Sequence, residues 1–134
     1  MTMQASKGKS PQSYKDLEIF QMARVLAIRV HKMTLEKLPK FEMFEEGSQI
    51  RRSAKSIEMN IVEGFGRKHY RGDYVKHFTY ALSEDDETKE HLDILFETHS
   101  LADEALYRDL YQSYEILGRK IYRFRESVIG DESF

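Results

Sequence analysis

The chain has 134 residues with no cysteine, 33% charged residues and a formal net charge of −2 at pH 7. This length fits one domain, the lack of cysteine excludes disulfides and thiolate chemistry, and the slightly negative charge gives no overall basic excess for nucleic-acid binding. With seven glycines, two prolines and no apolar run of membrane-spanning length, we expect an all-α, cytoplasmic protein without a signal peptide or membrane partner.

Four amphipathic segments follow one another along the chain. We expect a flexible basic tail at residues 1–13, a helical domain at 14–128 and a short C-terminal tail at 129–134. Apolar residues three and four positions apart predict helices at about 16–38, 48–65, 73–99 and 103–128, with Pro39 ending the first and Ser48 capping the second. Short connections favour an up-down-up-down antiparallel four-helix bundle.

Charge is sorted along the chain in a way that the net value hides. Between Arg51 and Arg71 six cations face two acids, whereas between Glu84 and Glu104 nine acids face one lysine. The last helix is basic again near its end, at Arg119, Lys120, Arg123 and Arg125. The turn from Gly66 to Gly72 is the best phosphate-binding candidate, because its cations stand beside two glycines that allow close backbone approach.

Four consecutive acids, Glu84–Glu87, step around the third predicted helix, so one of them must lie near the apolar stripe. Asp85 is the best placed, seven residues after Phe78 and seven before Leu92. A buried carboxylate needs a cation, either on the second helix or on another subunit. The candidates on the second helix are Arg51, Arg52 and Lys55.

Catalytic sites are weakly indicated. Di-iron bundles need Glu-x-x-His pairs, and none of the five histidines has a glutamate three residues earlier, so we expect no metal and no cofactor. A small metal-independent RNase would pair an arginine with a histidine across four to six intervening residues, as at Arg24 and His31 or at Arg71 and His77. About one such pair is expected by chance, so this hypothesis remains the weaker one.

The second predicted helix carries the most specific string in the chain, an Arg-Arg pair followed by Ser-Ile-x-x-Asn-Ile-x-Glu-Gly-x-Gly-Arg. Its residues are Arg51, Arg52, Ser56, Ile57, Asn60, Ile61, Glu63, Gly64, Gly66 and Arg67. This string resembles the hallmark of the four-helix-bundle proteins encoded in 23S rRNA intervening sequences, relatives of the accessory variability determinant of diversity-generating retroelements. The resemblance implies a homopentameric barrel and, from the retroelement relatives, association with nucleic acid and a reverse transcriptase.

The motif has a physical interpretation of its own. Small polar residues spaced three and four apart form a ridge beside the apolar stripe, which permits close helix approach. We therefore assign architectural roles to Ser56, Asn60, Glu63, Gly64 and Gly66. In particular, Glu63 should pair with Arg67 one turn later, and Gly64 should mark close packing or a bend.

These observations predict a non-enzymatic, homo-oligomeric scaffold that binds RNA or an RNA-bound protein. The expected phosphate-binding cations are Arg51, Arg52, Lys55, Arg67, Lys68 and Arg71. Fivefold repetition of such a surface would multiply weak phosphate contacts. The alternative is an adaptor that binds only proteins and needs no basic surface.

Overall fold

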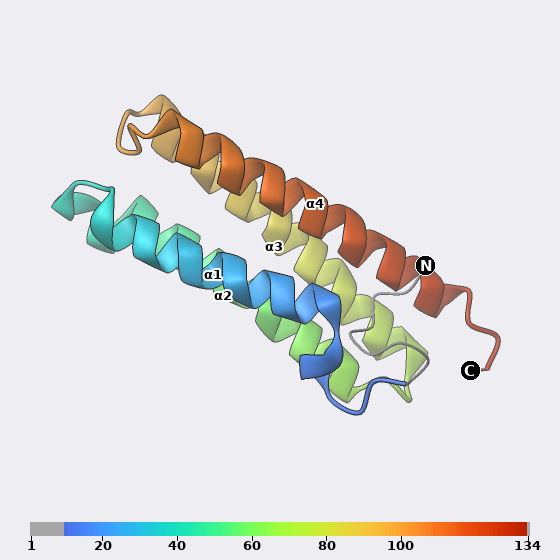
Figure 1. Cartoon of the computed structure of the whole chain (residues 1–134). Coiled ribbons are helices and arrows are strands. Elements are labelled where there is room, and N and C mark those ends of the chain that lie inside the picture. Colours follow the sequence, from blue (N-terminus) through green and yellow to red (C-terminus); the bar gives the residue numbers. More distant parts are fainter. Residues whose placement is uncertain (1–9, 134) are drawn as a thin grey trace.

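The protein is all-helical over residues 10–133, the part of the chain that the computed structural model describes (Figure 1). Four α-helices span Glu18–Glu36 (α1), Glu46–Gly66 (α2), Arg71–Glu97 (α3) and Glu104–Ile129 (α4). Two 3-10 helices precede α1 and α2, at Tyr14–Asp16 (η1) and Lys40–Phe44 (η2). The predicted all-α class with four helices is confirmed, and most of the predicted basic tail lies outside the described residues.

The start of α2 differs from the prediction. Ser48 is not the N-cap, because the helix begins two residues earlier and the Glu42 carboxylate accepts a hydrogen bond from the Glu46 amide at 3.0 Å. The η2 turn brings Glu42 back under this helix end, where Ser100 also donates to its carboxylate at 2.5 Å. Gly47 makes that approach possible, since a Cβ there would lie 2.4 Å from the Glu42 carbonyl oxygen.

The helices pack as a closed set. Contacts join α1 to α2, α2 to α3, α3 to α4 and α1 to α4, so each helix lies against two others. In Figure 1 the α1–α2 and α3–α4 connections lie at one end of the molecule and the α2–α3 turn lies at the other. The predicted stripes form the core, and its largest fully buried side chains include Leu17, Ile19, Ile50, Ile57, Ile61, Phe78, Leu92, Leu95, Leu110, Tyr114 and Leu117.

Two helix ends show how local residues limit the helices. Asp103 caps α4, because its carboxylate accepts from the Leu106 amide at 3.1 Å. The third helix ends at Glu97, two residues before the predicted end, and His99 just beyond it has a φ of 66°, in the left-handed region that favours glycine. None of the helices within residues 10–133 is long and apolar enough to cross a membrane.

Candidate functional site

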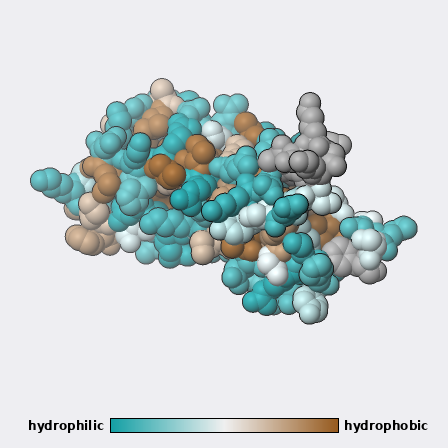
Figure 2. All heavy atoms as spheres, turned by 60° about the horizontal axis from the view of Figure 1, so that its bottom comes forward, coloured by the Kyte–Doolittle hydropathy of each residue, from teal (hydrophilic) through white to brown (hydrophobic). Residues whose placement is uncertain are grey.

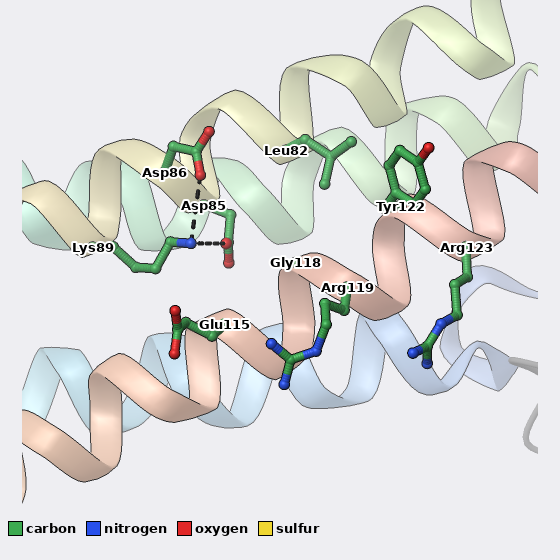
Figure 3. A pocket seen from close by; sticks show the side chains of 9 residues that line it. All are labelled: Leu82, Asp85, Asp86, Lys89, Glu115, Gly118, Arg119, Tyr122 and Arg123. Atoms are coloured by element: carbon green, nitrogen blue, oxygen red, sulfur yellow. Dashed lines mark ion pairs between the residues drawn. The ribbon is translucent and has the colours of Figure 1, made fainter.

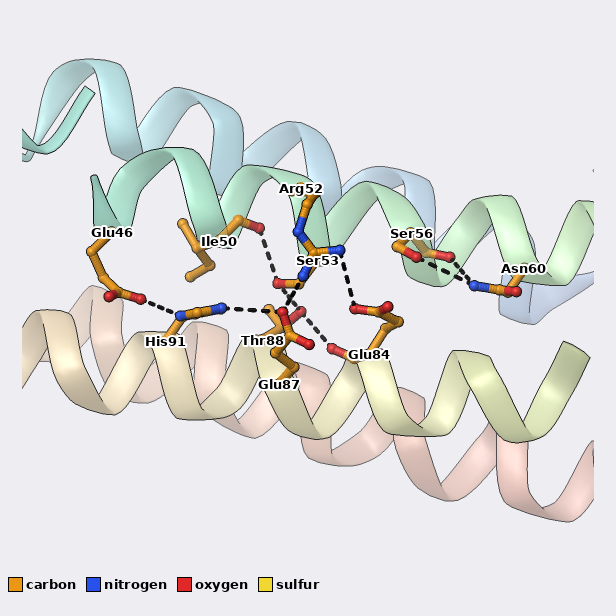
Figure 4. Close-up of polar contacts among 10 residues, drawn as sticks. All are labelled: Glu46, Ile50, Arg52, Ser53, Ser56, Asn60, Glu84, Glu87, Thr88 and His91. Carbon is orange, nitrogen blue, oxygen red and sulfur yellow. Dashed lines mark hydrogen bonds and ion pairs between the residues drawn. The ribbon is translucent and has the colours of Figure 1, made fainter. Parts of the chain in front are cut away.

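The motif of α2 lies against α3 (Figure 4). The Ser53 and Thr88 hydroxyls are 2.8 Å apart, and Thr88 also donates to the Glu84 carbonyl at 2.8 Å. The Asn60 amide donates to the Ser56 carbonyl at 3.0 Å, and its carbonyl oxygen lies 3.2 Å from Nδ1 of His77. The small polar ridge thus joins α2 to α3 through side-chain hydrogen bonds.

The two glycines of the motif differ. At Gly64 a Cβ would lie 2.7 Å from the Phe78 ring, so the predicted close packing is present. At Gly66 a Cβ would meet no described atom within 4 Å, so packing does not require glycine there. Glu63 and Arg67 form the expected ion pair at 3.5 Å.

Three of the six predicted phosphate-binding cations lie along the first half of α2. Arg51 is turned inward, where it donates to the Thr34 hydroxyl at 2.9 Å and to the Met43 carbonyl at 2.6 Å. Arg52 forms ion pairs with Glu84 at 3.8 Å and with Glu87. Lys55 lies in a groove between α1 and α2. Arg51 and Arg52 are therefore occupied by contacts within the bundle.

The other three cations lie at the α2–α3 turn. Arg67 pairs with Glu63 and, at 3.6 Å, with Asp73. The Lys68 ammonium lies 4.2 Å above the Phe65 ring, and Arg71 donates to the Asp131 carbonyl. With a rise of about 1.5 Å per residue, Arg51 and Arg67 are roughly 24 Å apart along α2. The structure thus divides the six cations between two separate regions.

Asp85 is buried as predicted, with its side chain 2% exposed, but the predicted partner on α2 is wrong, because no cation of α2 pairs with it among the described residues. The nearest cation is Lys89, one turn along the same helix, with its ammonium 3.7 Å from Oδ2. Arg52 on α2 reaches Glu84 and Glu87 instead, because those two acids face that helix. Burial raises the pKa of the Asp85 carboxyl to about 7, although Lys89 acts to lower it.

A pocket of about 550 Å³ lies beside Asp85 between α3 and α4 (Figure 3). Its other lining residues are Leu82, Asp86, Lys89, Glu115, Gly118, Arg119, Tyr122 and Arg123. Two of the four cations near the end of α4 therefore face a pocket. The remaining two are engaged elsewhere, since Lys120 pairs with Glu18 at 3.4 Å and Arg125 donates to Thr79 at 3.1 Å.

A second hollow, of about 520 Å³, lies between α1 and α2 on the outside of the bundle. We call it the α1–α2 groove; its lining residues are Arg24, Ala27, Ile28, His31, Lys32, Lys55, Glu58 and Met59. Ile28 is 48% exposed and Met59 56% exposed. Figure 2 views the molecule from the side that faces down in Figure 1 and shows several hydrophobic side chains at the surface. This groove was not predicted from the sequence, although Ile28 is an apolar residue outside the buried stripe.

The two arginine–histidine pairs have other contacts. Arg24 pairs with Glu58 at 3.5 Å, while His31 lines the α1–α2 groove. Arg71 donates to the Asp131 carbonyl, while His77 contacts Asn60. Within residues 10–133 no group of three or more histidine, aspartate or glutamate side chains is arranged to hold a metal ion.

Comparison with known proteins gives two findings. The family model described as 23S rRNA-intervening sequence protein matches residues 15–123. Among solved structures, a protein of unknown function from the S23 ribosomal protein family of Bacteroides thetaiotaomicron is similar, with a TM-score of 0.73 and 22% sequence identity. The similarity covers 81% of this chain and 95% of that one, and at this identity it supports the fold alone. No curated protein matches the chain.

Proposed function

The chain belongs to the 23S rRNA-intervening sequence protein family, and from this premise we propose that it is a cytoplasmic, homo-oligomeric scaffold without catalytic activity. In this proposal the four helices follow an up-down-up-down order and the bundle assembles into a homopentameric barrel. The barrel binds RNA or an RNA-bound protein such as a reverse transcriptase. The observation that supports the assembly is the α1–α2 groove.

The groove combines exposed apolar side chains with a cationic rim. Ile28 and Met59 provide its apolar surface, and neighbouring Val25 on α1 is 57% exposed. Contiguous exposed apolar side chains bordered by polar ones are typical of protein interfaces. Lys32 and Lys55 line this groove, and its one acid, Glu58, pairs with Arg24 at 3.5 Å, so its natural complement is an acidic surface.

The chain itself offers that acidic surface. Between Glu90 and Glu97, α3 has three acids and no lysine or arginine. A contact between the groove of one subunit and this part of α3 on the next would be heterologous, and heterologous contacts close into rings when the rotation between subunits permits. Charge complementarity of this kind fixes the orientation of the partners. The complementary charges of the groove and α3 support a ring of identical subunits.

Ile28→Glu tests the assembly. A carboxylate at this position would be desolvated in the subunit contact, so light scattering coupled to size-exclusion chromatography should report the monomer mass for this variant and a multiple of it for the unchanged chain. Ile129→Glu is the matched control, because Ile129 is 43% exposed at the far end of α4, outside the groove. Equal masses for the two variants would contradict the assignment of the interface.

RNA binding is best supported at the α2–α3 turn. Lys68 makes a cation–π contact with Phe65 and forms no ion pair with a carboxylate among the described residues. We expect fluorescence anisotropy to show binding of single-stranded RNA that weakens steeply between about 50 and 200 mM salt. Lys68→Glu should reduce this affinity more than Arg52→Glu, since Arg52 is already neutralised by acids of α3.

A specific observation also favours an adaptor that binds only proteins. Arg52 and Arg67 each pair with two carboxylates, which leaves little free positive charge at those positions. If no RNA binds even at about 50 mM salt, the RNA-binding part of the proposal is wrong and the adaptor function replaces it. RNA cleavage that is lost on His77→Ala would instead show an enzyme and contradict the scaffold.

A further inference from the structure

The pocket between α3 and α4, here called the Asp85 pocket, has two chemically different ends (Figure 3). The buried carboxylate of Asp85 lies at one end, between the two helices, and Arg119 and Arg123 line the other end from α4, with their guanidinium groups extended away from α3. Leu82 and Tyr122 add apolar surface between α3 and α4. The volume of about 550 Å³ is within the range of sites for small organic ligands.

One oxygen of the Asp85 carboxylate has no hydrogen-bond donor among the described residues. Oδ1 of Asp85 is buried and accepts no hydrogen bond from any residue between 10 and 133. Lys89 lies 3.7 Å from Oδ2, which is beyond hydrogen-bonding distance. A carboxylate left in this condition destabilises the fold, and chains carry such groups at functional sites. A ligand that brings N–H donors to this end would satisfy the carboxylate.

A glycine makes room for this arrangement. A Cβ at Gly118 would lie 2.7 Å from Oδ2 of Asp85, so any side chain on α4 at this point would displace the carboxylate. Asp85 can therefore extend across to the backbone of α4 only because residue 118 has no side chain. The position of Asp85 in the Asp85 pocket therefore depends on the glycine at residue 118.

The basic end is arranged for an anion. Arg119 and Arg123 are one turn apart on α4, so their side chains project from the same face of the helix. Neither forms an ion pair or hydrogen bond with another residue of the part of the chain that the structure describes. Two adjacent guanidinium groups are well suited to a phosphate, which they bind through paired N–H donors.

We propose that the Asp85 pocket binds one guanine nucleotide, either free or as an unstacked residue of single-stranded RNA. Guanine presents two adjacent N–H donors, N1–H and the N2 amine, which match the two oxygens of a carboxylate. The base lies against Leu82 and Tyr122, and the phosphate lies between Arg119 and Arg123. This inference deepens the RNA-binding part of the proposed function and does not use the α1–α2 groove.

The neighbouring charges fix the orientation of the ligand. Asp86 and Glu115 lie at the same end as Asp85 and repel a phosphate from it. Lys89 is also 3.5 Å from Asp86, so it keeps an ion-pair partner when the base displaces it from Asp85. The base therefore enters toward α3 and the phosphate stays on α4.

Calorimetric titration of the full-length chain with guanosine, inosine and adenosine monophosphates tests this proposal. We expect guanosine monophosphate to bind about tenfold more tightly than the other two, because inosine lacks the N2 amine and adenine presents an acceptor in place of N1–H. Asp85→Asn should abolish this preference, and Gly118→Ala should weaken binding by displacing Asp85. Arg123→Gln should weaken binding of the nucleotide but not of guanosine, whereas Arg108→Gln, on the same helix outside the pocket, should change nothing.

The source of the nucleotide is resolved by a second titration, with an oligouridine that carries one guanosine and with pure oligouridine. Preference for the guanosine-containing strand identifies an RNA residue, and binding of the mononucleotide alone identifies a free nucleotide. Equal affinity for guanosine and adenosine monophosphates, no binding of either, or a preference that survives Asp85→Asn would overturn the inference. Assembly through the α1–α2 groove and the effect of Lys68→Glu on RNA affinity are measured separately, so each proposal can fail alone.

Discussion

Replacement of the buried acid Asp85 by asparagine should stabilise the protein, and more so as the pH rises. Burial raises the pKa of this carboxyl from its usual value of 3.8 to about 7, against the opposing effect of Lys89. The folded state therefore binds the proton more tightly than the unfolded state. A group with a raised pKa contributes stability that is present below the unfolded pKa and lost as the pH rises through the folded pKa.

The size of the effect follows from the same values. Each unit of pKa difference corresponds to about 1.4 kcal/mol, so the shift from 3.8 to about 7 sets an upper limit on the order of 4 kcal/mol. This free energy is lost between about pH 4 and pH 7. Asp85→Asn removes the titrating group, so its free energy of unfolding should exceed that of the unchanged chain by about 1–4 kcal/mol at pH 8 and by much less at pH 5.

Urea unfolding at pH 5, 6, 7 and 8, at a fixed protein concentration, measures this difference. Asp86→Asn is the matched control, because the adjacent Asp86 side chain is 80% exposed, so its replacement should change the free energy of unfolding little. A stability difference between Asp85→Asn and the unchanged chain that is constant from pH 5 to pH 8 would refute the assignment of the titrating group.

Four further substitutions should change stability in the ways given below, each measured by urea or thermal unfolding. Gly64→Ala should destabilise the protein by about 1–3 kcal/mol, because a Cβ there would lie 2.7 Å from the Phe78 ring. Gly66→Ala should be neutral or stabilising, because no described atom lies within 4 Å of a Cβ at that position. Equal effects of the two substitutions would contradict these predictions. Tyr114→Phe removes a buried hydroxyl that has no hydrogen-bond partner within residues 10–133, so it should leave the stability unchanged or raise it by up to about 1 kcal/mol. A large loss of stability would show that the hydroxyl has a hydrogen-bond partner in solution. His99→Gly should stabilise by roughly 0.5–1 kcal/mol, because the φ of 66° favours glycine, and a loss would contradict that reasoning.

The fold could be predicted from the sequence because the apolar spacing is regular. Every predicted helix is present, and Asp85 could be identified because it stands at heptad distance from Phe78 and Leu92 on the buried stripe. The start of α2 could not be predicted, since its amide is capped by Glu42 from an adjoining turn and not by a residue next to the helix. Contacts of this kind depend on how the connection folds back.

The candidate sites could be predicted less well than the fold. A high density of cations in the sequence does not show which of them are neutralised, and Arg52 pairs with acids that are 32 and 35 residues further along the chain. The α1–α2 groove depends on the crossing of two helices, so Ile28 and Met59 come together only in three dimensions. The Asp85 pocket likewise requires the pairing of Asp85 with Gly118 on another helix.

The most direct test of the scaffold proposal is native mass spectrometry of the unchanged full-length chain at low micromolar concentration. We expect a dominant species of five times the 15.9 kDa chain mass, and single chains for the Ile28→Glu variant. A dominant species of 15.9 kDa for the unchanged chain, at every concentration measured, would contradict the proposed assembly.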